Sequence, residues 1–536
     1  MYNCCAAATI VETPMTDYVT KQPVATSCLF MLFCVFVLFF NLGGRTLENT
    51  DYLHYAEIGR EIIETGDWVI MHDGGRMYVD KPPLHSLHIA LAFKLFGVNT
   101  FSARFPSALL ALIGAAAAFF WGMRLDGKNI KTGIYTALLL LSSYGFFWLS
   151  RRPRNDVEYS VLFSLCLIFF YEGYAACSRR SRTILYCLFW IILGLAVLIK
   201  GPAGFLPLLI IVVFLAFQKG WKQAGLKHFF FAMPLLFVVV MPYLVMLVQH
   251  PQFPEFLIAL KNKVIMTRSG GPLYYIPVFF TKFFPASILL ACVAPVLWRQ
   301  REAFRNNPRL AFALIWACVY LFIIHLVKAK VYRYLLPSFI PLAAITAWGM
   351  QQILPKLRLP HKLMRWWPIP AAAVCIGFPI VICVMTGWSW TALELGLVSA
   401  AIFFLFMKID RDPVIFICLC CIFCLLFIDV FQTGNNEKVS DVRNLYRALE
   451  QRHIRPEEIA TYRTGRMRVS LCFYFSHILP DTMTSGELHR QAGAKAVITN
   501  PEFKDEVVGV YGSYREEMLL KNHQGDEGHD RCVLFY

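Results

Sequence analysis

Residues 50–97 read TDYLHYAEIGREIIETGDWVIMHDGGRMYVDKPPLHSLHIALAFKLFG and lie between the first two long apolar segments of the chain. The stretch contains Asp51, Glu57, Asp80 and Lys81, and charges in this number are costly in hydrocarbon. It is also too long to be a simple turn. It therefore predicts a structured loop at one face of a membrane.

Two helices are expected in this loop. Thr50 or Asp51 caps the first, Gly66 suits its end, and its apolar residues share one stripe: Leu53, Ile58, Ile62 and Ile63. We expect this helix to lie flat on the membrane with its carboxylates facing water. Gly74-Gly75 then makes a turn, and residues 78–83 form a stiff extended segment, because each proline restricts itself and the residue before it. A second amphipathic segment follows over residues 84–96.

The composition excludes a soluble globular protein. Of the 536 residues, 57% are hydrophobic and only 16% are charged, and the mean hydropathy is +0.53. The first 26 residues carry acidic, Thr and Pro residues, and no A-x-A site follows the first apolar segment. We therefore expect a retained first span and no cleaved signal peptide. The sequence predicts an α-helical polytopic membrane protein.

Thirteen apolar segments have about the length that one helical crossing needs. They lie near 28–43, 103–123, 132–149, 157–177, 184–199, 202–218, 229–249, 273–297, 310–327, 334–354, 367–386, 390–407 and 413–431. With the N-terminus inside, the connections that face the cytoplasm are all basic: 124–131, 178–183, 219–228, 298–309, 355–366 and 408–412. This pattern satisfies the positive-inside rule and places the tail outside. Much of the formal net charge of +16 thus belongs to topology, and we expect no nucleic-acid partner.

Three regions follow from this topology. Residues 1–27 form a cytoplasmic N-terminal tail, and residues 28–431 form the transmembrane domain, with its outer loop at 44–101. Residues 432–536 are expected to form a small periplasmic α/β domain, because a helical pattern over 438–452 is followed by short apolar segments.

Basic residues also occur on the outer side, where positive charge is disfavoured. They are Lys81, Arg151, Arg152, Arg154, Lys200, Lys261, Lys263, Arg268, Lys328, Lys330 and Arg333. Several stand at the ends of spans, and such cations indicate a bound anion, best a phosphate or pyrophosphate on a lipid. The alternative is that single lysines extend to lipid headgroups.

Two carboxylates accompany these cations. Asp51 begins the first outer loop, and Asp156 opens the fourth span directly after an arginine cluster. A partly buried aspartate can serve as a base for an incoming hydroxyl, while cations stabilise a phosphate leaving group. The alternatives are a helix N-cap for Asp51 and an ion pair with Arg152 or Arg154 for Asp156. The combination indicates group transfer from a lipid phosphate.

No metal or redox signature accompanies these residues. His54, Asp80, His85 and His325 carry ligand atoms that a divalent metal accepts, but their spacing is not diagnostic, so a metal cofactor stays open. Most of the 17 cysteines lie in or beside spans, where cysteine acts as a small apolar residue. Cys472 and Cys532 belong to the tail, where an oxidising compartment would let them pair.

The order of several motifs resembles a known family. The stretch YAEIGREIIETGDWV, followed by YVDKPPL and FKLFGVNTFSARFPSAL, is similar to the opening of the GT-C membrane glycosyltransferases that use polyprenyl-phosphate sugars. This family includes protein O-mannosyltransferases and the lipid A aminoarabinose transferase. The later stretches SRRPRNDVEYSVLF, GLAVLIKGPAGFL and YRYLLPSFIPLAAI also resemble the family, in the same order.

The resemblance implies sugar transfer from a polyprenyl (undecaprenyl) phosphate donor on the outer face of the bacterial inner membrane, by an inverting single displacement. The acceptor would be a glycolipid of the lipid A type or a protein. By position, Asp51 and Asp156 would be the acidic site residues. The donor phosphate would be bound by Lys81, Lys200, Tyr78, Arg268 and Arg333.

The chain departs from the family motif at three positions. Where the family often reads D-E-x-R, Tyr52 replaces the glutamate and His54 replaces the arginine, which leaves Asp51 as the one acid of the pair. Asp80 stands where a glutamate often precedes Lys-Pro-Pro.

Other function classes fit less well. A lipid-linked glycan ligase or polymerase shares the lipid donor, but the two large outer elements favour the transferases. A secondary transporter should show charges near mid-membrane and an internal repeat, neither of which is evident. A membrane scaffold would leave the outer charges without a reason.

Overall fold

The computed structural model describes residues 23–44, 47, 50–222, 224–262, 270–271, 273–354 and 412–439, together with parts of 394–401 and of 445–535. These residues divide into two compact units. The first unit comprises 1–40, 112–148 and 268–431, and the second comprises 41–111, 149–267 and 432–536. The outer loop, the arginine cluster and Lys200 all belong to the second unit.

The described residues contain six helices that are long and apolar enough to cross a membrane, or up to eight if each of two bent pairs is one span. The six are Thr100–Leu125, Asn155–Ala175, Arg179–Gln218, Leu226–Gln249, Pro308–Leu326 and Pro413–Val430. The predicted helical membrane protein is confirmed at this level. The segment predicted at 367–386, and most of that at 390–407, lies outside the described residues.

The stretch Arg179–Gln218 is about twice as long as one crossing requires. It consists of α9 (Arg179–Lys200), a short 3-10 helix η1 (Gly201–Phe205) and α10 (Leu206–Gln218). Gly201 has φ +60°, a left-handed conformation that glycine adopts without strain, so the chain can change direction there. This break agrees with the two segments predicted at 184–199 and 202–218.

Two segments, each predicted as one span, are bent. The segment at 132–149 forms α6 (Ile130–Ser142) and α7 (Tyr144–Ser150), which meet at 72°. The segment at 273–297 forms α14 (Tyr275–Lys282) and α15 (Ala286–Arg299), which meet at 106°. Pro285 stands in this second break, and the residue before a proline is disfavoured in a helix.

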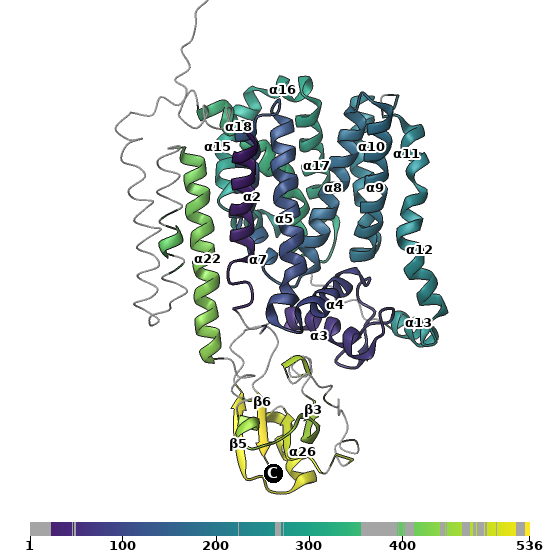
Figure 1. The fold of residues 1–536 in the computed structure, drawn as a ribbon, viewed down its shortest axis with the longest axis vertical. Helices are drawn as coiled ribbons and strands as arrows, with labels where there is room; N and C mark the ends of the chain where they lie inside the picture. The colour runs from purple at the N-terminus through teal and green to yellow at the C-terminus, as the bar shows by residue number, and fades with distance from the viewer. Residues whose placement is uncertain are drawn as a thin grey trace, which may run out of the picture. The chain divides into compact units, whose positions relative to one another are not determined.

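The remaining described helices belong to both units, and two short ones, α13 and α16, lie in connections between the predicted segments. In the first unit these are α2 (Pro23–Phe39), α16 (Arg301–Asn306), α17 (Pro308–Leu326), η2 (Tyr332–Ser338), α18 (Phe339–Ile353) and α22 (Pro413–Val439). The second unit includes α8 (Asn155–Ala175), α11 (Leu226–Ala232), α12 (Pro234–Gln249) and α13 (Phe253–Lys261). Helix α5 (Thr100–Leu125) contributes to both units. Figure 1 shows α8, α9 and α12 running along one another within the second unit.

The helices and the turn of residues 50–96 follow the sequence prediction. Helix α3 spans Thr50–Thr65, and α4 spans Leu84–Phe96. Between them, β1 (His72–Asp73) and β2 (Arg76–Met77) form an antiparallel hairpin. Both turn residues, Gly74 and Gly75, have positive φ, as a two-residue hairpin turn requires. Helices α3 and α4 lie against each other across one end of α8 and α9 (Figure 1).

A close approach at Gly59 joins α3 to α4. A Cβ at Gly59 would lie 2.6 Å from Cγ2 of Ile89 and 3.3 Å from the backbone nitrogen of Ala90. The two helices enclose a cluster of buried side chains that includes Leu53, Ala56, Ile89 and Phe93. Glycine therefore permits the short distance on which this packing depends.

We predict that Gly59→Ala lowers thermal stability, because α4 must shift to make room for the methyl group. Overpacking of this kind costs about 1–3 kcal/mol. Thermal unfolding of the purified protein in detergent measures the effect. Gly509→Ala in α26 (Lys504–Tyr511) is the matched control, since nothing lies within 4 Å of its Cβ position. Equal melting temperatures for Gly59→Ala and the unmodified protein would contradict this account of the helix contact.

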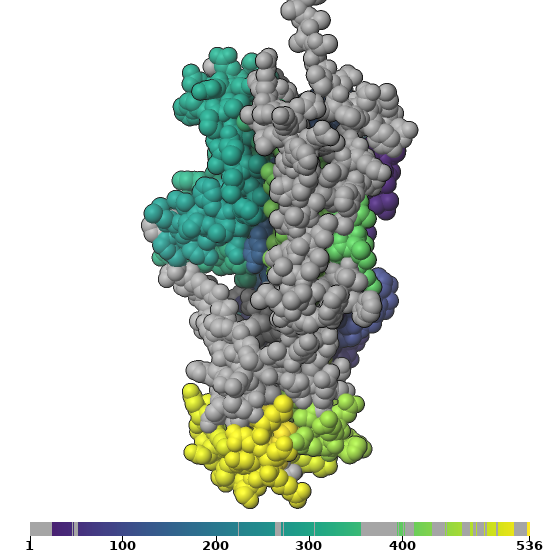
Figure 2. Space-filling view, turned by 90° about the vertical axis from the view of Figure 1, so that its left-hand side faces the viewer, coloured from purple at the N-terminus to yellow at the C-terminus, as the bar shows by residue number. Residues whose placement is uncertain are grey.

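The tail contains a mixed four-stranded sheet with the order β3-β4-β6-β5. Its strands are β3 (Ile459–Tyr462), β4 (Ala496–Thr499), β5 (Glu516–Leu520) and β6 (Arg531–Phe535). Strands β3 and β4 are parallel, and the other two pairs are antiparallel. Figure 2 shows the described residues of this region gathered in one lobe, coloured yellow and yellow-green.

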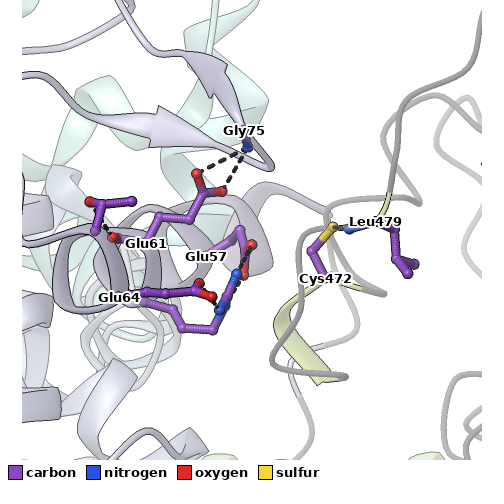
Figure 3. Close-up of polar contacts among 8 residues, drawn as sticks. Glu57, Glu61, Glu64, Gly75, Cys472 and Leu479 are labelled. Carbon is purple, nitrogen blue, oxygen red and sulfur yellow. Dashed lines mark hydrogen bonds and ion pairs between the residues drawn. The ribbon is translucent and has the colours of Figure 1, made fainter. Parts of the chain in front are cut away.

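Of the two cysteines in the tail, the structure describes the side chain of Cys472. Cys472 is buried, and its sulfur accepts a hydrogen bond from the Leu479 N–H at 3.3 Å (Figure 3). The side chain of Cys532 lies outside the described part of the chain.

Candidate active site

Asp156 and Lys200 meet at the ends of two helices. Asp156 lies in the first turn of α8, and Lys200 is the last residue of α9. Lys200 Nζ lies 2.8 Å from Asp156 Oδ1, and an Arg154 guanidinium nitrogen lies 3.3 Å from Asp156 Oδ2. Asp156 is buried, but the lysine side chain keeps 14% of its exposure. The predicted ion pair with Arg154 is thus present, and Lys200 is a second partner.

Tyr159 fixes the turn that follows Lys200. Its hydroxyl donates a 2.7 Å hydrogen bond to the backbone oxygen of Ala203, and the Lys200 ammonium lies 4.7 Å from the centre of its ring. Because Asp156 and Tyr159 stand one turn apart on α8, this helix positions Lys200 from two sides. The ammonium group is therefore held in place and still partly accessible.

The Lys-Pro-Pro segment reaches the same turn. The Cγ of Pro82 lies 3.7 Å from the position that a Cβ on Gly201 would occupy. Lys81 precedes Pro82 and is exposed, while Tyr78 is buried. The structure thus places the Pro82 ring, which follows Lys81, beside Gly201, which follows Lys200.

The arginine cluster contacts the start of α3. The guanidinium carbons of Arg152 and Arg154 lie 6.0 and 5.8 Å from the ring centre of Tyr52, and Arg154 lies 5.9 Å from that of Tyr55. Such contacts between a cation and a ring face are attractive, more so when they are shielded from water. Tyr52 therefore occupies the family's glutamate position with a side chain that still attracts arginine.

His54 also has a partner that the sequence did not reveal. Its Nδ1 lies 2.6 Å from Asp73 Oδ2 in the hairpin, and its ring packs edge-on against Tyr78 with centroids 4.8 Å apart. From their ligand atoms alone, His54 and Asp80 are candidates for a metal site. Within the described residues, no group of three or more His, Cys, Asp or Glu side chains lies close enough to hold a metal ion.

Three further residues were predicted to belong to the site: Asp51, Arg268 and Arg333. Asp51 is the second residue of α3, and its side chain lies outside the described part of the chain. Arg268 also lies outside the described residues. Arg333 is in η2 of the first unit, whereas Asp156 and Lys200 are in the second.

One expectation for α3 was wrong. The carboxylates of Glu57 and Glu61 are buried and do not face water. Arg60 donates two 2.8 Å hydrogen bonds to Glu57, and the Gly75 N–H lies 3.0 Å from both oxygens of Glu61. In Figure 3 the Glu61 side chain points from α3 to Gly75. Partners on the same helix and on the hairpin satisfy these acids, so burial is tolerated.

Burial raises the pKa of Glu57 to about 7, although Arg60 acts in the opposite direction. Burial also raises the pKa of Glu61. A raised pKa in the folded state stabilises the fold below the pKa of the unfolded chain, and this contribution is lost as the pH rises through the folded value.

We therefore predict that thermal stability falls between pH 4.5 and about pH 7, and that Glu57→Gln makes this dependence flatter. Across this pH range, Glu57 is expected to lower the free energy of unfolding by on the order of 3 kcal/mol. Thermal unfolding across this pH range measures it. Glu64→Gln is the control, because Glu64 also contacts Arg60 but its side chain is 45% exposed. An unchanged pH dependence in Glu57→Gln would contradict the prediction.

The chain is similar in sequence to a family of known proteins. Residues 80–246 match the family model described as dolichyl-phosphate-mannose-protein mannosyltransferase. A protein of Aquifex aeolicus described as uncharacterized is 26% identical over 354 residues, which are 65% of this chain and 69% of the relative. The undecaprenyl phosphate-alpha-4-amino-4-deoxy-L-arabinose arabinosyl transferase of Edwardsiella ictaluri is 26% identical over 336 residues. That alignment covers 60% of this chain and 59% of the transferase.

A solved structure shares the fold along nearly the whole chain. The crystal structure of ArnT from Cupriavidus metallidurans bound to undecaprenyl phosphate matches with a TM-score of 0.71 at 21% identity. The match covers 95% of this chain and 98% of ArnT. The apo state of the same protein matches with a TM-score of 0.72. Together, the family match, the relatives and the shared fold confirm the predicted resemblance to the membrane glycosyltransferases that use polyprenyl-phosphate sugars.

Proposed function

We propose that this chain transfers a sugar from an undecaprenyl-phosphate donor to a glycolipid of the lipid A type, on the outer face of the bacterial inner membrane. The observation that carries this proposal is the contact between the Lys81-Pro82 segment and the Lys200-Gly201 turn, beside buried Asp156. In this proposal the two lysines, from separate segments, bind one donor phosphate. The arabinosyl transferases and the undecaprenyl-phosphate-bound ArnT structure support this choice of donor.

In the proposed reaction the acceptor hydroxyl oxygen attacks the anomeric carbon of the sugar. The bond from that carbon to the phosphate oxygen breaks, and undecaprenyl phosphate leaves with the electron pair. Lys81 and Lys200 stabilise the charge that grows on this phosphate. Asp51 takes the proton from the acceptor hydroxyl, and a single displacement of this kind inverts the configuration at the anomeric carbon.

Asp156 has a different role from Asp51 in this proposal. Its two oxygens already face Lys200 and Arg154, and the start of α8 favours its negative charge. A carboxylate held by two cations is poorly suited to accept a proton. Asp156 therefore orients Lys200 toward the phosphate.

The same proposal includes the topology. Thirteen spans would place the outer loop and residues 432–536 on the periplasmic side. The basic cytoplasmic connections in the sequence support this orientation. Accessibility of single engineered cysteines to a membrane-impermeant thiol reagent, in a background without reactive cysteines, tests each connection.

The experiment that tests the function offers the purified protein in lipid vesicles a panel of undecaprenyl-phosphate sugars together with lipid A. Mass spectrometry detects any sugar added to lipid A. The proposal expects a mass increase that depends on both the donor and the protein. Transfer only to a protein acceptor would overturn the choice of acceptor. Absence of both turnover and lipid-phosphate binding would favour a transporter.

A further inference from the structure

A buried cluster that the sequence did not predict joins α4 to α8. The two carboxylate oxygens of Glu158 lie 2.9 Å from Nδ1 of His85 and 2.9 Å from Nδ1 of His88. Glu158 is fully buried, and His85 is 2% exposed. The two histidines stand one helical turn apart on α4, so both can face the same carboxylate.

Glu158 and the two histidines stabilise each other by charge attraction and hydrogen bonds. A carboxylate that leaves water needs partners for its lone pairs, and here each oxygen has one. Burial alone would lower the pKa of His88, but the charge and the hydrogen bond of Glu158 raise it above its ordinary value. The cluster is therefore a strong and directional connection between two helices.

The position of the cluster relates it to the candidate site. Glu158 lies two residues after Asp156, in the first turn of α8. His85 lies in the first turn of α4, directly after Pro82-Pro83, and Lys81 precedes these prolines. Because the two prolines are stiff, the orientation of α4 determines where Lys81 lies. Pro82 in turn contacts the turn at Gly201.

We propose that Glu158, His85 and His88 are positioning residues that hold the Lys81 segment against the Asp156–Lys200 ion pair. Two hydrogen bonds from the histidine rings to one carboxylate fix the rotation of α4 about its axis, which apolar packing alone would leave less defined. Both lysines then reach the same donor phosphate. This inference rests on the proposed function and adds the means by which its two cations are kept together.

A double-mutant cycle tests the inference, because it isolates the coupling between two positions. The measured quantity is the affinity of the full-length protein in lipid nanodiscs for undecaprenyl phosphate. Glu158→Gln is made in the unmodified background and in Lys81→Ala. We expect Glu158→Gln to weaken binding about tenfold in the first background. In the Lys81→Ala background we expect Glu158→Gln to reduce this affinity much less, because the cluster acts through Lys81.

His85 provides a second pair of variants that keeps the test decisive if Glu158→Gln does not fold. His85→Asn retains a side-chain N–H near the place of Nδ1, so it should keep most of the affinity. His85→Leu removes this donor and should lose affinity as Glu158→Gln does. Glu172→Gln is the matched control, because it removes another buried carboxylate near the far end of α8. It should bind undecaprenyl phosphate as the unmodified protein does.

The outcomes separate the inference from the function. Equal losses with and without Lys81 would overturn the inference and leave the proposed function intact. An equal loss in Glu172→Gln, or in His85→Asn and His85→Leu alike, would do the same. Failure of the unmodified protein to bind undecaprenyl phosphate would overturn the proposed function, and the inference with it.

Discussion

Asp51→Asn should abolish sugar transfer while leaving donor binding nearly unchanged. Loss of a general base lowers the rate by about 10²–10⁴-fold. Asparagine has nearly the same shape as aspartate but cannot take the proton of the acceptor hydroxyl. Asp51 is the second residue of α3, and the next residue, Tyr52, faces the arginine cluster. The backbone of Asp51 therefore lies next to a residue that contacts the arginine cluster.

Single-turnover transfer in vesicles and equilibrium binding of undecaprenyl phosphate measure the two parts of this prediction separately. Asp505→Asn in the first turn of α26 is the matched control, since Asp505 is an exposed aspartate at a helix start in the tail. It should transfer at the unmodified rate. Full turnover by a folded Asp51→Asn protein would remove Asp51 from the reaction.

Lys200→Ala should weaken binding of undecaprenyl phosphate by about 10–100-fold, because a hydrogen bond to a charged group contributes about 1.5–3 kcal/mol. Lys200 is held by Asp156 at 2.8 Å and by the Tyr159 ring, with part of its side chain still accessible. A cation held in this way loses little conformational freedom when the phosphate binds. The transfer rate at saturating donor should fall as well, because the leaving phosphate loses a stabilising charge.

Lys222→Ala is the matched control for this prediction. Lys222 is an exposed lysine beyond the end of α10, at the opposite end of that helix from the Lys200 turn, and its removal changes the net charge equally. We expect unmodified affinity in this variant. Equal weakening in both variants would show that the effect of Lys200 is general electrostatic attraction and not a specific contact.

Much of the outer loop could be predicted from local signals. Helical periodicity indicated α3 and α4, with capping residues for α3, and the paired glycines indicated the hairpin turn. The burial of Glu57 and Glu61 could not be predicted in this way, because a carboxylate on a helix ordinarily faces water. The partner of Glu57 is Arg60, three residues along the same helix, and the partner of Glu61 is the N–H of Gly75, fourteen residues away.

The candidate site was predicted only in part, for a similar reason. Charges at the ends of spans indicated that Asp156 and Lys200 lie on the same face, but not that they form an ion pair across 44 residues. The partners of the two family departures, Tyr52 and His54, also come from distant segments. For His85 and His88, their spacing of three residues within α4 was the one local signal, and the carboxylate that they share lies 70 residues after His88 in the chain.

The most direct test of the account counts undecaprenyl phosphate released from an undecaprenyl-phosphate sugar in vesicles that also contain lipid A. The unmodified protein and Asp51→Asn are compared side by side, with and without the acceptor. The account predicts release that requires lipid A, equals the sugar added to it, and disappears in Asp51→Asn. Release that is equal in the two proteins, or that proceeds without any acceptor, would contradict direct transfer assisted by Asp51.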